Sequence, residues 1–191
     1  MMLTMLTQST DVCKDNRAQQ ILNILSSAGA APYIGESVSQ LEHALQCAFL
    51  ATVAKASDTM VLAALLHDVG HIGLQGSSDL RHDERGARLL SHFGFAQDIV
   101  SLVLGHFEVK RYLVFRNRRY LTRLSWETRR VLNMQGGPMT AQEAEVFERD
   151  PLFKARLALR EWDERAKVAN LQVPQLEAYR GCLERYLAQS S

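Results

Sequence analysis

The residues best suited to chemistry stand at the end of an apolar run, Leu62 to Leu66, that leads directly into His67 and Asp68. Apolar residues lie almost all round this segment, which predicts a buried helix. An unpaired charge in such a place costs roughly several kcal/mol, so the pair needs a bound cation or a hydrogen-bonded His–Asp couple. Neighbouring helical side chains point about 100° apart, yet they can converge on one ion, or Asp68 can bridge two.

Further histidines and one aspartate suit the same centre. Five separate segments supply the candidate ligands of a two-metal site, which are His43, His67, Asp68, His82, His106 and Asp163. A helical bundle builds a metal centre in its core from ligands of this kind. Taken alone, His106 is more often a packing residue and Asp163 a solvated helix charge. We assign His92, just before Gly94, to a helix end, where its charge complements the helix dipole.

The hydrophobic periodicity predicts an all-α bundle, a single domain of residues 1–191, with residues 1–14 loose. Asp58 is expected to cap its helix, and Thr140 with Glu143 is typical of a capping box. His82 is expected to open a helix, and His106 to lie within one. The predicted helices cover residues 16–27, 37–54, 58–69, 82–92, 97–115, 125–134 and 151–169, with a last one from Pro174.

The composition argues against several classes of partner. A formal net charge of +1 favours neither nucleic acid nor an acidic membrane surface. No apolar run is long enough to span a bilayer, and the first residues lack the pattern of a signal peptide. Cys13, Cys47 and Cys182 share no metal-binding or redox spacing, and an odd number of scattered thiols indicates a reducing compartment. We therefore expect a cytoplasmic protein.

The order of the candidate ligands resembles the HD superfamily, an all-α group of metal-dependent phosphohydrolases whose two-metal members carry the additional histidines. The resemblance narrows to the mixed-valent diiron oxygenases that cleave carbon–phosphorus bonds. It covers roughly residues 30–186 and is carried by residues 33–36, 40–46, 62–68, 105–114 and 135–139. Hydrolases of the superfamily often have a lysine after the His-Asp-x-Gly turn, whereas this chain has His71, as in the oxygenase branch.

This resemblance implies two iron ions, Fe(II)/Fe(III), with dioxygen as co-substrate and Asp68 as the bridge. His43, His67 and Asp163 would hold one iron, and His82 and His106 the other. The substrate would be an organophosphonate with a 1-hydroxyl group, oxidised to a carboxylate and phosphate. The two irons carry about +5 and the two aspartates about −2, so a phosphonate dianion with an ionised hydroxyl would nearly neutralise the centre.

The resemblance also implies a set of residues around the substrate. Lys110, Arg160 and Thr128 would clamp the phosphonate, because two fixed cations and a hydroxyl suit a dianion. His71 would donate to the phosphonate or to an oxygen at the metals. Gln40 would steady the helix that carries His43 or meet the substrate ammonium.

A gate is implied for the loop that contains Pro32 and Gly35. Tyr33 would occupy iron in the resting enzyme and leave when substrate arrives, and Glu36 would be linked to it. Residues 73–81 are shorter and less acidic than expected for the enzyme of 2-amino-1-hydroxyethylphosphonate, whose product is glycine. We therefore favour 1-hydroxy-2-(trimethylammonio)ethylphosphonate, which forms no N–H hydrogen bonds and yields glycine betaine.

Two alternatives stay open. The same ligands suit a phosphohydrolase that activates water with Mn(II) or Mg(II) and acts on a phosphate ester or nucleotide. His71, Tyr33 and residues 135–139 argue against it. The second alternative is a non-catalytic sensor on an HD scaffold, which predicts degraded ligands, whereas all six are present.

Overall fold

Helices dominate the computed structural model, which describes residues 8–27, 31–33, 37–72, 81–134 and 136–189. The only pairing of extended backbone in these ranges is an isolated antiparallel bridge between Pro32 and Ser39. The predicted all-α class is therefore confirmed. In chain order the helices are α1 (Gln8–Ser27), α2 (Gln40–Val53), α3 (Asp58–Leu66), the 3₁₀ turn η1 (Val69–His71), α4 (His82–His92), α5 (Gln97–Leu104), α6 (His106–Arg116), η2 (Arg118–Arg123), α7 (Trp126–Met134), α8 (Ala141–Glu148), α9 (Phe153–Arg165), η3 (Leu176–Tyr179) and α10 (Arg180–Gln189).

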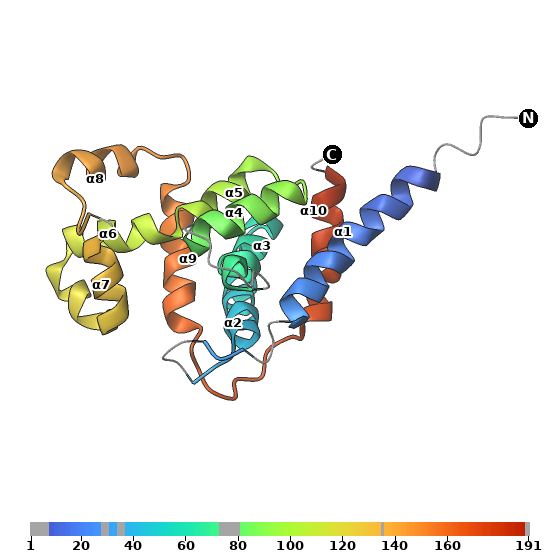
Figure 1. Cartoon of the computed structure of the whole chain (residues 1–191), viewed down its shortest axis with the longest axis horizontal. Coiled ribbons are helices and arrows are strands. Elements are labelled where there is room, and N and C mark those ends of the chain that lie inside the picture. Colours follow the sequence, from blue (N-terminus) through green and yellow to red (C-terminus); the bar gives the residue numbers. More distant parts are fainter. Residues whose placement is uncertain (1–7, 28–30, 34–36, 73–80, 135, 190–191) are drawn as a thin grey trace, which may run out of the picture.

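One main apolar core joins the beginning of the described chain to its end. α2 packs on α3, α4 packs on α5, and α10 lies beside α1 at one end of the molecule (Figure 1). Leu25, Leu62, Leu102 and Leu183 come from four of these helices and are almost completely buried. Full burial of such a side chain contributes about 1.5–3 kcal/mol to folding. No helix of the described ranges is long and apolar enough to cross a membrane.

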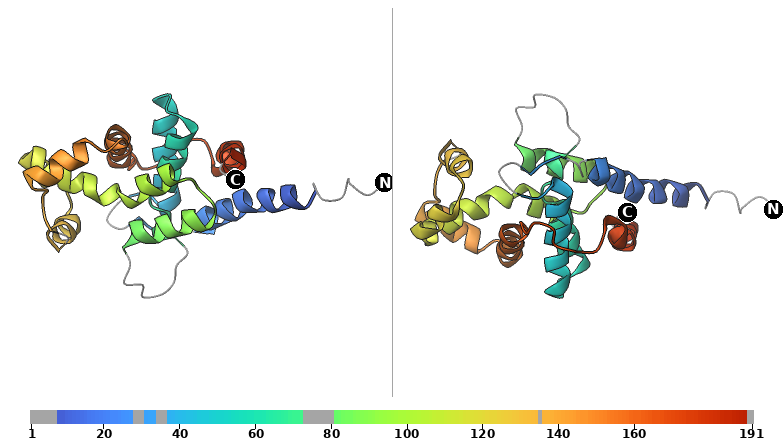
Figure 2. Two further views of the ribbon diagram at one scale, coloured as in Figure 1. Left: turned by 90° about the horizontal axis from the view of Figure 1, so that it is seen from above. Right: turned by 90° about the horizontal axis from the view of Figure 1, so that it is seen from below.

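Residues 107–134 and 136–150 form an outer lobe at the end opposite α1 (Figures 1 and 2). Two small apolar clusters hold it together. The first contains Phe107, Val114, Tyr120, Leu124 and Leu132, and the second contains Val109, Tyr112, Met139, Ala144 and Phe147. α9 stands between the lobe and the main bundle, where it contacts α2, α3 and α6. A change in the lobe can therefore reach the bundle through α6 and α9.

Two predicted caps had different outcomes. Thr140 and Glu143 form the expected capping box at α8. The prediction for Asp58 is wrong, because the N-cap of α3 is Ser57, whose hydroxyl accepts from the Met60 N–H. Asp58 is instead the first helical residue and accepts a hydrogen bond from Arg185 at 2.8 Å. A carboxylate there still complements the positive end of the helix dipole.

The predicted helix over residues 97–115 is wrong, since the chain breaks at Gly105 into α5 and α6. The Arg156 side chain passes directly over Gly105 and donates to the Ser101 carbonyl at 2.8 Å. A Cβ atom at Gly105 would lie 1.4 Å from the guanidinium, so any other residue would force the Arg156 side chain to move. His106 consequently begins α6 and does not lie within a longer helix.

Several other boundaries also differ from the sequence prediction, among them the start of α1 and the end of α9. α1 begins at Gln8, so residues 8–14 are helical, while residues 1–7 lie outside the described ranges. No proline or glycine interrupts this part of the chain. α9 ends at Arg165 and does not reach residue 169. It ends there because the next backbone carbonyls turn towards α2, where His43 and Gln46 bind them.

Candidate metal centre

The inner part of the centre contains two histidines and two aspartates that are almost completely buried. His43 of α2 and His67, at the end of α3, face each other with their Nε2 atoms 3.2 Å apart. Oδ1 of Asp163, from α9, lies 3.3 Å from Nε2 of His43. Oδ2 of Asp68 lies 3.4 Å from Nε2 of His67. Four donor groups from three helices thus meet at one point.

The other oxygens of the two aspartates reach two further imidazoles. Oδ2 of Asp163 is 3.4 Å from Nε2 of His106, and Oδ1 of Asp68 is 3.8 Å from Nε2 of His82. The structure therefore brings all six predicted ligands together, with both carboxylates between two pairs of imidazoles. The sequence analysis assigned the bridging position to Asp68 alone, whereas Asp163 lies between two histidines in the same way.

Gly70 explains how His82 comes to lie beside this site. A Cβ atom at Gly70 would lie 1.8 Å from the His82 carbonyl oxygen and 2.6 Å from the Gly86 nitrogen. η1 therefore packs directly on the first turn of α4, as only a glycine permits. The rings of His71 and His82 consequently stack with centroids 4.1 Å apart.

Backbone carbonyls fix the inner imidazoles. Nδ1 of His43 is 2.8 Å from the Ala166 oxygen, and Nδ1 of His67 is 2.8 Å from the Ala64 oxygen. A carbonyl oxygen only accepts hydrogen bonds, so each Nδ1 carries a proton. Each Nε2 therefore points towards the centre, where its lone pair can bind a metal. Histidines that bind metals are oriented in this way.

Oδ1 of Asp68 provides a test of whether a cation fits. It is buried without a hydrogen-bond donor among the described residues, which is costly for a carboxylate oxygen. A metal ion at this position would satisfy it. Three groups offer donor atoms that lie within 4.8 Å of one another: His43, Cys47 and His67; His67, Asp68 and His106; and Asp68, His71 and His82. Apart from the Cys47 thiol, these are nitrogen and oxygen donors, which suit a transition metal.

Burial and neighbouring charges set the protonation states. Burial lowers the pKa of His82 to about 4, and burial together with the Lys110 cation holds the pKa of His106 well below its usual value. Both imidazoles are therefore neutral. Burial opposes the ionisation of Asp163, yet the Arg160 guanidinium holds the pKa of that carboxyl well below its usual range. Neutral imidazoles and ionised carboxylates are the forms that bind metals.

His67 behaves differently when no cation is present. Burial disfavours its charged form, but the adjacent Asp68 carboxylate outweighs this and raises the pKa of His67 to about 9. A proton on His67 then compensates the carboxylate. Metal binding must displace this proton, so metal affinity should increase with pH.

Tyr33 closes one side of the centre. Its hydroxyl donates to Oδ2 of Asp68 at 3.1 Å, and its ring stacks on His43 with centroids 4.3 Å apart. The Lys167 ammonium lies 5.4 Å from the centroid of the same ring. Burial and the Asp68 charge raise the pKa of Tyr33, so the phenol keeps its proton. Glu36, predicted to be linked to Tyr33, lies outside the described residues.

The predicted phosphonate clamp is brought together only in part. Arg160 is buried and donates to Asp163, and the electrostatic influence of Lys110 reaches Asp163 and Asp68. Burial, with Arg160 nearby, lowers the pKa of Lys110 to about 8. The Thr128 hydroxyl instead shares a hydrogen bond with Ser125 Oγ at 2.9 Å, and no described contact joins it to the centre.

Gln40 and His71 lie at the edge of the site. The Gln40 side chain is buried, and its Oε1 has no hydrogen-bond partner among the described residues. His71 as a whole residue is exposed. Its ring is nevertheless partly desolvated by its neighbours, which lowers the pKa of the imidazole and favours the neutral form. Both positions suit contact with a ligand, and their predicted roles stay predictions.

Sequence reasoning missed Cys47 and the partners of Arg160. Sγ of Cys47 lies 3.8 Å from Nε2 of His43, and burial raises the pKa of this thiol to about 11. The spacing of four residues from His43 could have revealed it, because such residues share a helix face. Glu164 follows Arg160 by four residues and could have been predicted by the same spacing, whereas nothing in the sequence indicated that Tyr120 binds Arg160.

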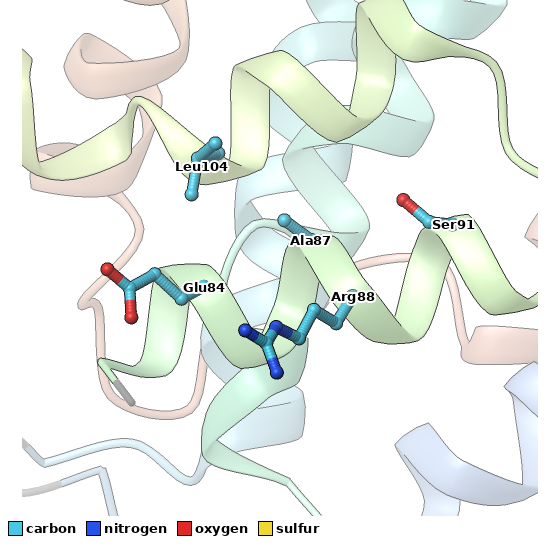
Figure 3. Close-up of a pocket in the computed structure, with 5 residues that line it drawn as sticks. All are labelled: Glu84, Ala87, Arg88, Ser91 and Leu104. Carbon is cyan, nitrogen blue, oxygen red and sulfur yellow. The ribbon is translucent and has the colours of Figure 1, made fainter. Parts of the chain in front are cut away.

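A separate hollow lies on the surface beside α4. Glu84, Ala87, Arg88, Ser91 and Leu104 line it, and its volume is about 320 Å³ (Figure 3). None of the six clustered histidines and aspartates contributes to its lining. The hollow is therefore distinct from the candidate metal centre.

Comparison with known proteins identifies the architecture around these ligands. The family model of the HD domain matches residues 41–151, more than half of the chain. The chain belongs to the HD-domain family. The predicted resemblance is thus confirmed, and the match includes five of the six candidate ligands, while Asp163 follows it on α9.

Named relatives extend over nearly the whole chain. The hydroxymethylphosphonate dioxygenase of Gimesia maris is 37% identical over 88% of this chain and 89% of its own length. The glycine-betaine-forming 1-hydroxy-2-(trimethylamino)ethylphosphonate dioxygenase of Leisingera caerulea is 36% identical over 86% of this chain and 88% of its own length. An uncharacterized protein of Acanthamoeba polyphaga mimivirus is 36% identical over 90% of this chain and 82% of its own length. The protein is an oxygenase of the HD superfamily.

Proposed function

We propose that the protein cleaves the carbon–phosphorus bond of a 1-hydroxyphosphonate with dioxygen, at two iron ions held by the clustered histidines and aspartates. The observation that carries this proposal is the placement of Asp68 and Asp163 between two pairs of imidazoles. The names of two relatives support the reaction and the phosphonate substrate. The donor set has no required thiolate, which suits iron.

The reaction balances without an external reductant. A 1-hydroxyphosphonate dianion and dioxygen give a carboxylate, hydrogen phosphate and a proton. The bond between carbon and phosphorus breaks, and the substrate supplies the four electrons that reduce dioxygen. When bound, the iron pair would supply the redox capacity and polarise the substrate oxygens.

The protein's own side chains would bind and orient the phosphonate. Lys110 and Arg160 place two cations beside the aspartates, where they would face a dianion. His71, next to His82, would donate to a phosphonate oxygen, and Thr128 would join the clamp if its hydroxyl leaves Ser125. Tyr33 would give way to substrate, because its hydroxyl occupies Oδ2 of Asp68.

The group attached to the carbon that bears the hydroxyl and the phosphonate is the finer question. We propose the trimethylammonium substrate, with glycine betaine as product, ahead of the amino and hydroxymethyl analogues. The relative from Leisingera caerulea supports it, whereas the relative from Gimesia maris is equally similar and supports hydroxymethylphosphonate. Of residues 73–81, from which the sequence prediction came, only Arg81 is described, and it pairs with Asp83 at 2.9 Å.

Turnover under air tests the proposal directly. The iron-loaded protein is given each of the three hydroxyphosphonates, and oxygen uptake, phosphate and the carboxylate product are measured. We expect equal amounts of oxygen consumed and phosphate released, about two irons per chain, and the highest kcat/KM with the trimethylammonium substrate. Phosphate release without oxygen would favour a phosphohydrolase instead.

A further inference from the structure

Arg160 is held in one orientation by two residues outside the metal centre. Its buried guanidinium donates from Nη1 to Oδ2 of Asp163, and its Nε donates to the Tyr120 hydroxyl at 2.8 Å and to Oε1 of Glu164 at 2.9 Å. The Tyr120 hydroxyl donates in turn to the same Glu164 oxygen. The three side chains close a ring of hydrogen bonds. Within the described part of the chain, the hydrogen bond that leaves this ring runs from Arg160 to Asp163, a candidate metal ligand.

Tyr120 connects this ring to the outer lobe. It belongs to η2 and is buried in the cluster of Phe107, Val114, Leu124 and Leu132. Phe107 directly follows His106, so the same cluster lies behind two candidate ligand positions. The packing of the lobe therefore fixes where the Tyr120 hydroxyl stands, and through it the direction of the guanidinium.

We propose that Tyr120 and Glu164 are positioning residues, which aim Arg160 at Asp163 and thereby set the metal affinity of the site. The inference rests on the proposed metal centre but not on the substrate. Arginine presents its donors in a rigid fork, so fixing the Nε edge also fixes the Nη1 edge. Without the tyrosine acceptor, only the partly exposed Glu164 would hold that edge, and the Asp163 carboxylate would lose its fixed orientation.

Tyr112 provides a matched control within the same lobe. Both tyrosines are almost completely buried, at 6% exposure for Tyr112 and 7% for Tyr120. The hydroxyl of Tyr112 also donates to a glutamate, Oε1 of Glu148, at 2.7 Å. Tyr112 packs in the other small cluster, and no described contact joins it to Arg160 or Asp163. Replacing either tyrosine by phenylalanine thus removes the same chemical group.

The test measures binding of Zn(II), and of Fe(II) without oxygen, to full-length Tyr120→Phe and Tyr112→Phe in competition with a chelator. We expect Tyr120→Phe to weaken metal binding about tenfold, as changes behind a metal ligand do, and Tyr112→Phe by less than about twofold. Thermal melting checks that both variants fold. Glu164→Ala, which removes the acceptor of both Nε and the Tyr120 hydroxyl, should weaken binding by at least about threefold; it provides a second variant if Tyr120→Phe does not fold, and unchanged binding there would overturn the proposal.

Equal metal affinities in the two phenylalanine variants would overturn the proposal. A Tyr120→Phe variant whose KM for phosphonate rises while its metal affinity is unchanged would also overturn it, since Arg160 would then act only on substrate. Metal binding is measured without substrate. A failure here is therefore distinct from failure of the carbon–phosphorus cleavage assay.

Discussion

The two ends of the polar centre are built differently. At the inner end, His43 and His67 are fully buried, and backbone carbonyls of α9 and α3 hold their Nδ1 atoms. At the outer end, the His82 side chain is 24% exposed, and its described ring contacts are with His71 and His106. The inner end is thus preorganised by the backbone, while the outer end is open to solvent on the side where a ligand can enter.

This contrast follows from the elements that carry the histidines. His43 and His67 lie on helices of the main core, where the backbone carbonyls beside them are fixed. His82 begins α4 directly after residues 73–80, which lie outside the described ranges. Asp68 belongs to both ends, because its two oxygens face His67 and His82. Removing its charge is therefore the strongest test.

Asp68→Asn should weaken the connection between the two ends and leave Asp163 as the remaining bridge. The amide keeps the shape of the side chain but removes the charge, so we expect both metals to bind weakly and kcat/KM to fall by about 1,000-fold or more. Metal content and oxygen uptake measure this effect. Asp58→Asn is the control, since Asp58 pairs with Arg185 at 2.8 Å on the surface. Two tightly bound irons in Asp68→Asn would contradict the bridging role.

Replacing one histidine at each end should show which histidine stabilises the fold and which only binds metal. Without metal, His43→Ala should lower the free energy of unfolding by about 2–3 kcal/mol, because it leaves a cavity in the core and the Ala166 carbonyl without its partner, and removes one of the buried neighbours of Asp163. His82→Ala should change it by less than about 1 kcal/mol. Both should lose one metal per chain. Denaturant titration and metal analysis check this, and equal destabilisation would show that the ends do not differ.

Lys110 should give the outer end a dependence on pH. Its charge disfavours protonation of His71, His82 and His106, and burial lowers its own pKa to about 8 from an ordinary 10.5. The ammonium is present below pH 8 and is lost as the pH rises through that value. Since kcat/KM reports groups of the free enzyme, it should fall about tenfold per pH unit above 8.

Lys110→Arg provides the control for this assignment. A guanidinium stays charged throughout the accessible pH range, so the fall above pH 8 should disappear even if the maximal activity is lower. The measurement is kcat/KM for the phosphonate from pH 6 to about 10. A fall that persists unchanged in Lys110→Arg would assign it to another group.

Residue types and spacing were sufficient for the broad features of this protein. The apolar periodicity predicted an all-α fold, and α4 has the predicted bounds, because its start and its glycine-containing end are local signals. The six histidines and aspartates of the centre could be selected because such groups in apolar helices are costly without a partner. Local signals of this kind do not depend on how distant segments pack.

Packing between distant segments decided the rest. The break at Gly105 comes from Arg156, about fifty residues later, and the end of α9 comes from its contact with His43. The ring formed by Tyr120, Arg160 and Glu164 likewise joins α9 to η2, because Tyr120 lies 40 residues before Arg160 in the chain. Sequence therefore determined which groups the protein must bury and compensate. Only the tertiary structure decided which oxygen, nitrogen or cation compensates each of them, because those partners meet through packing and not through spacing along one helix.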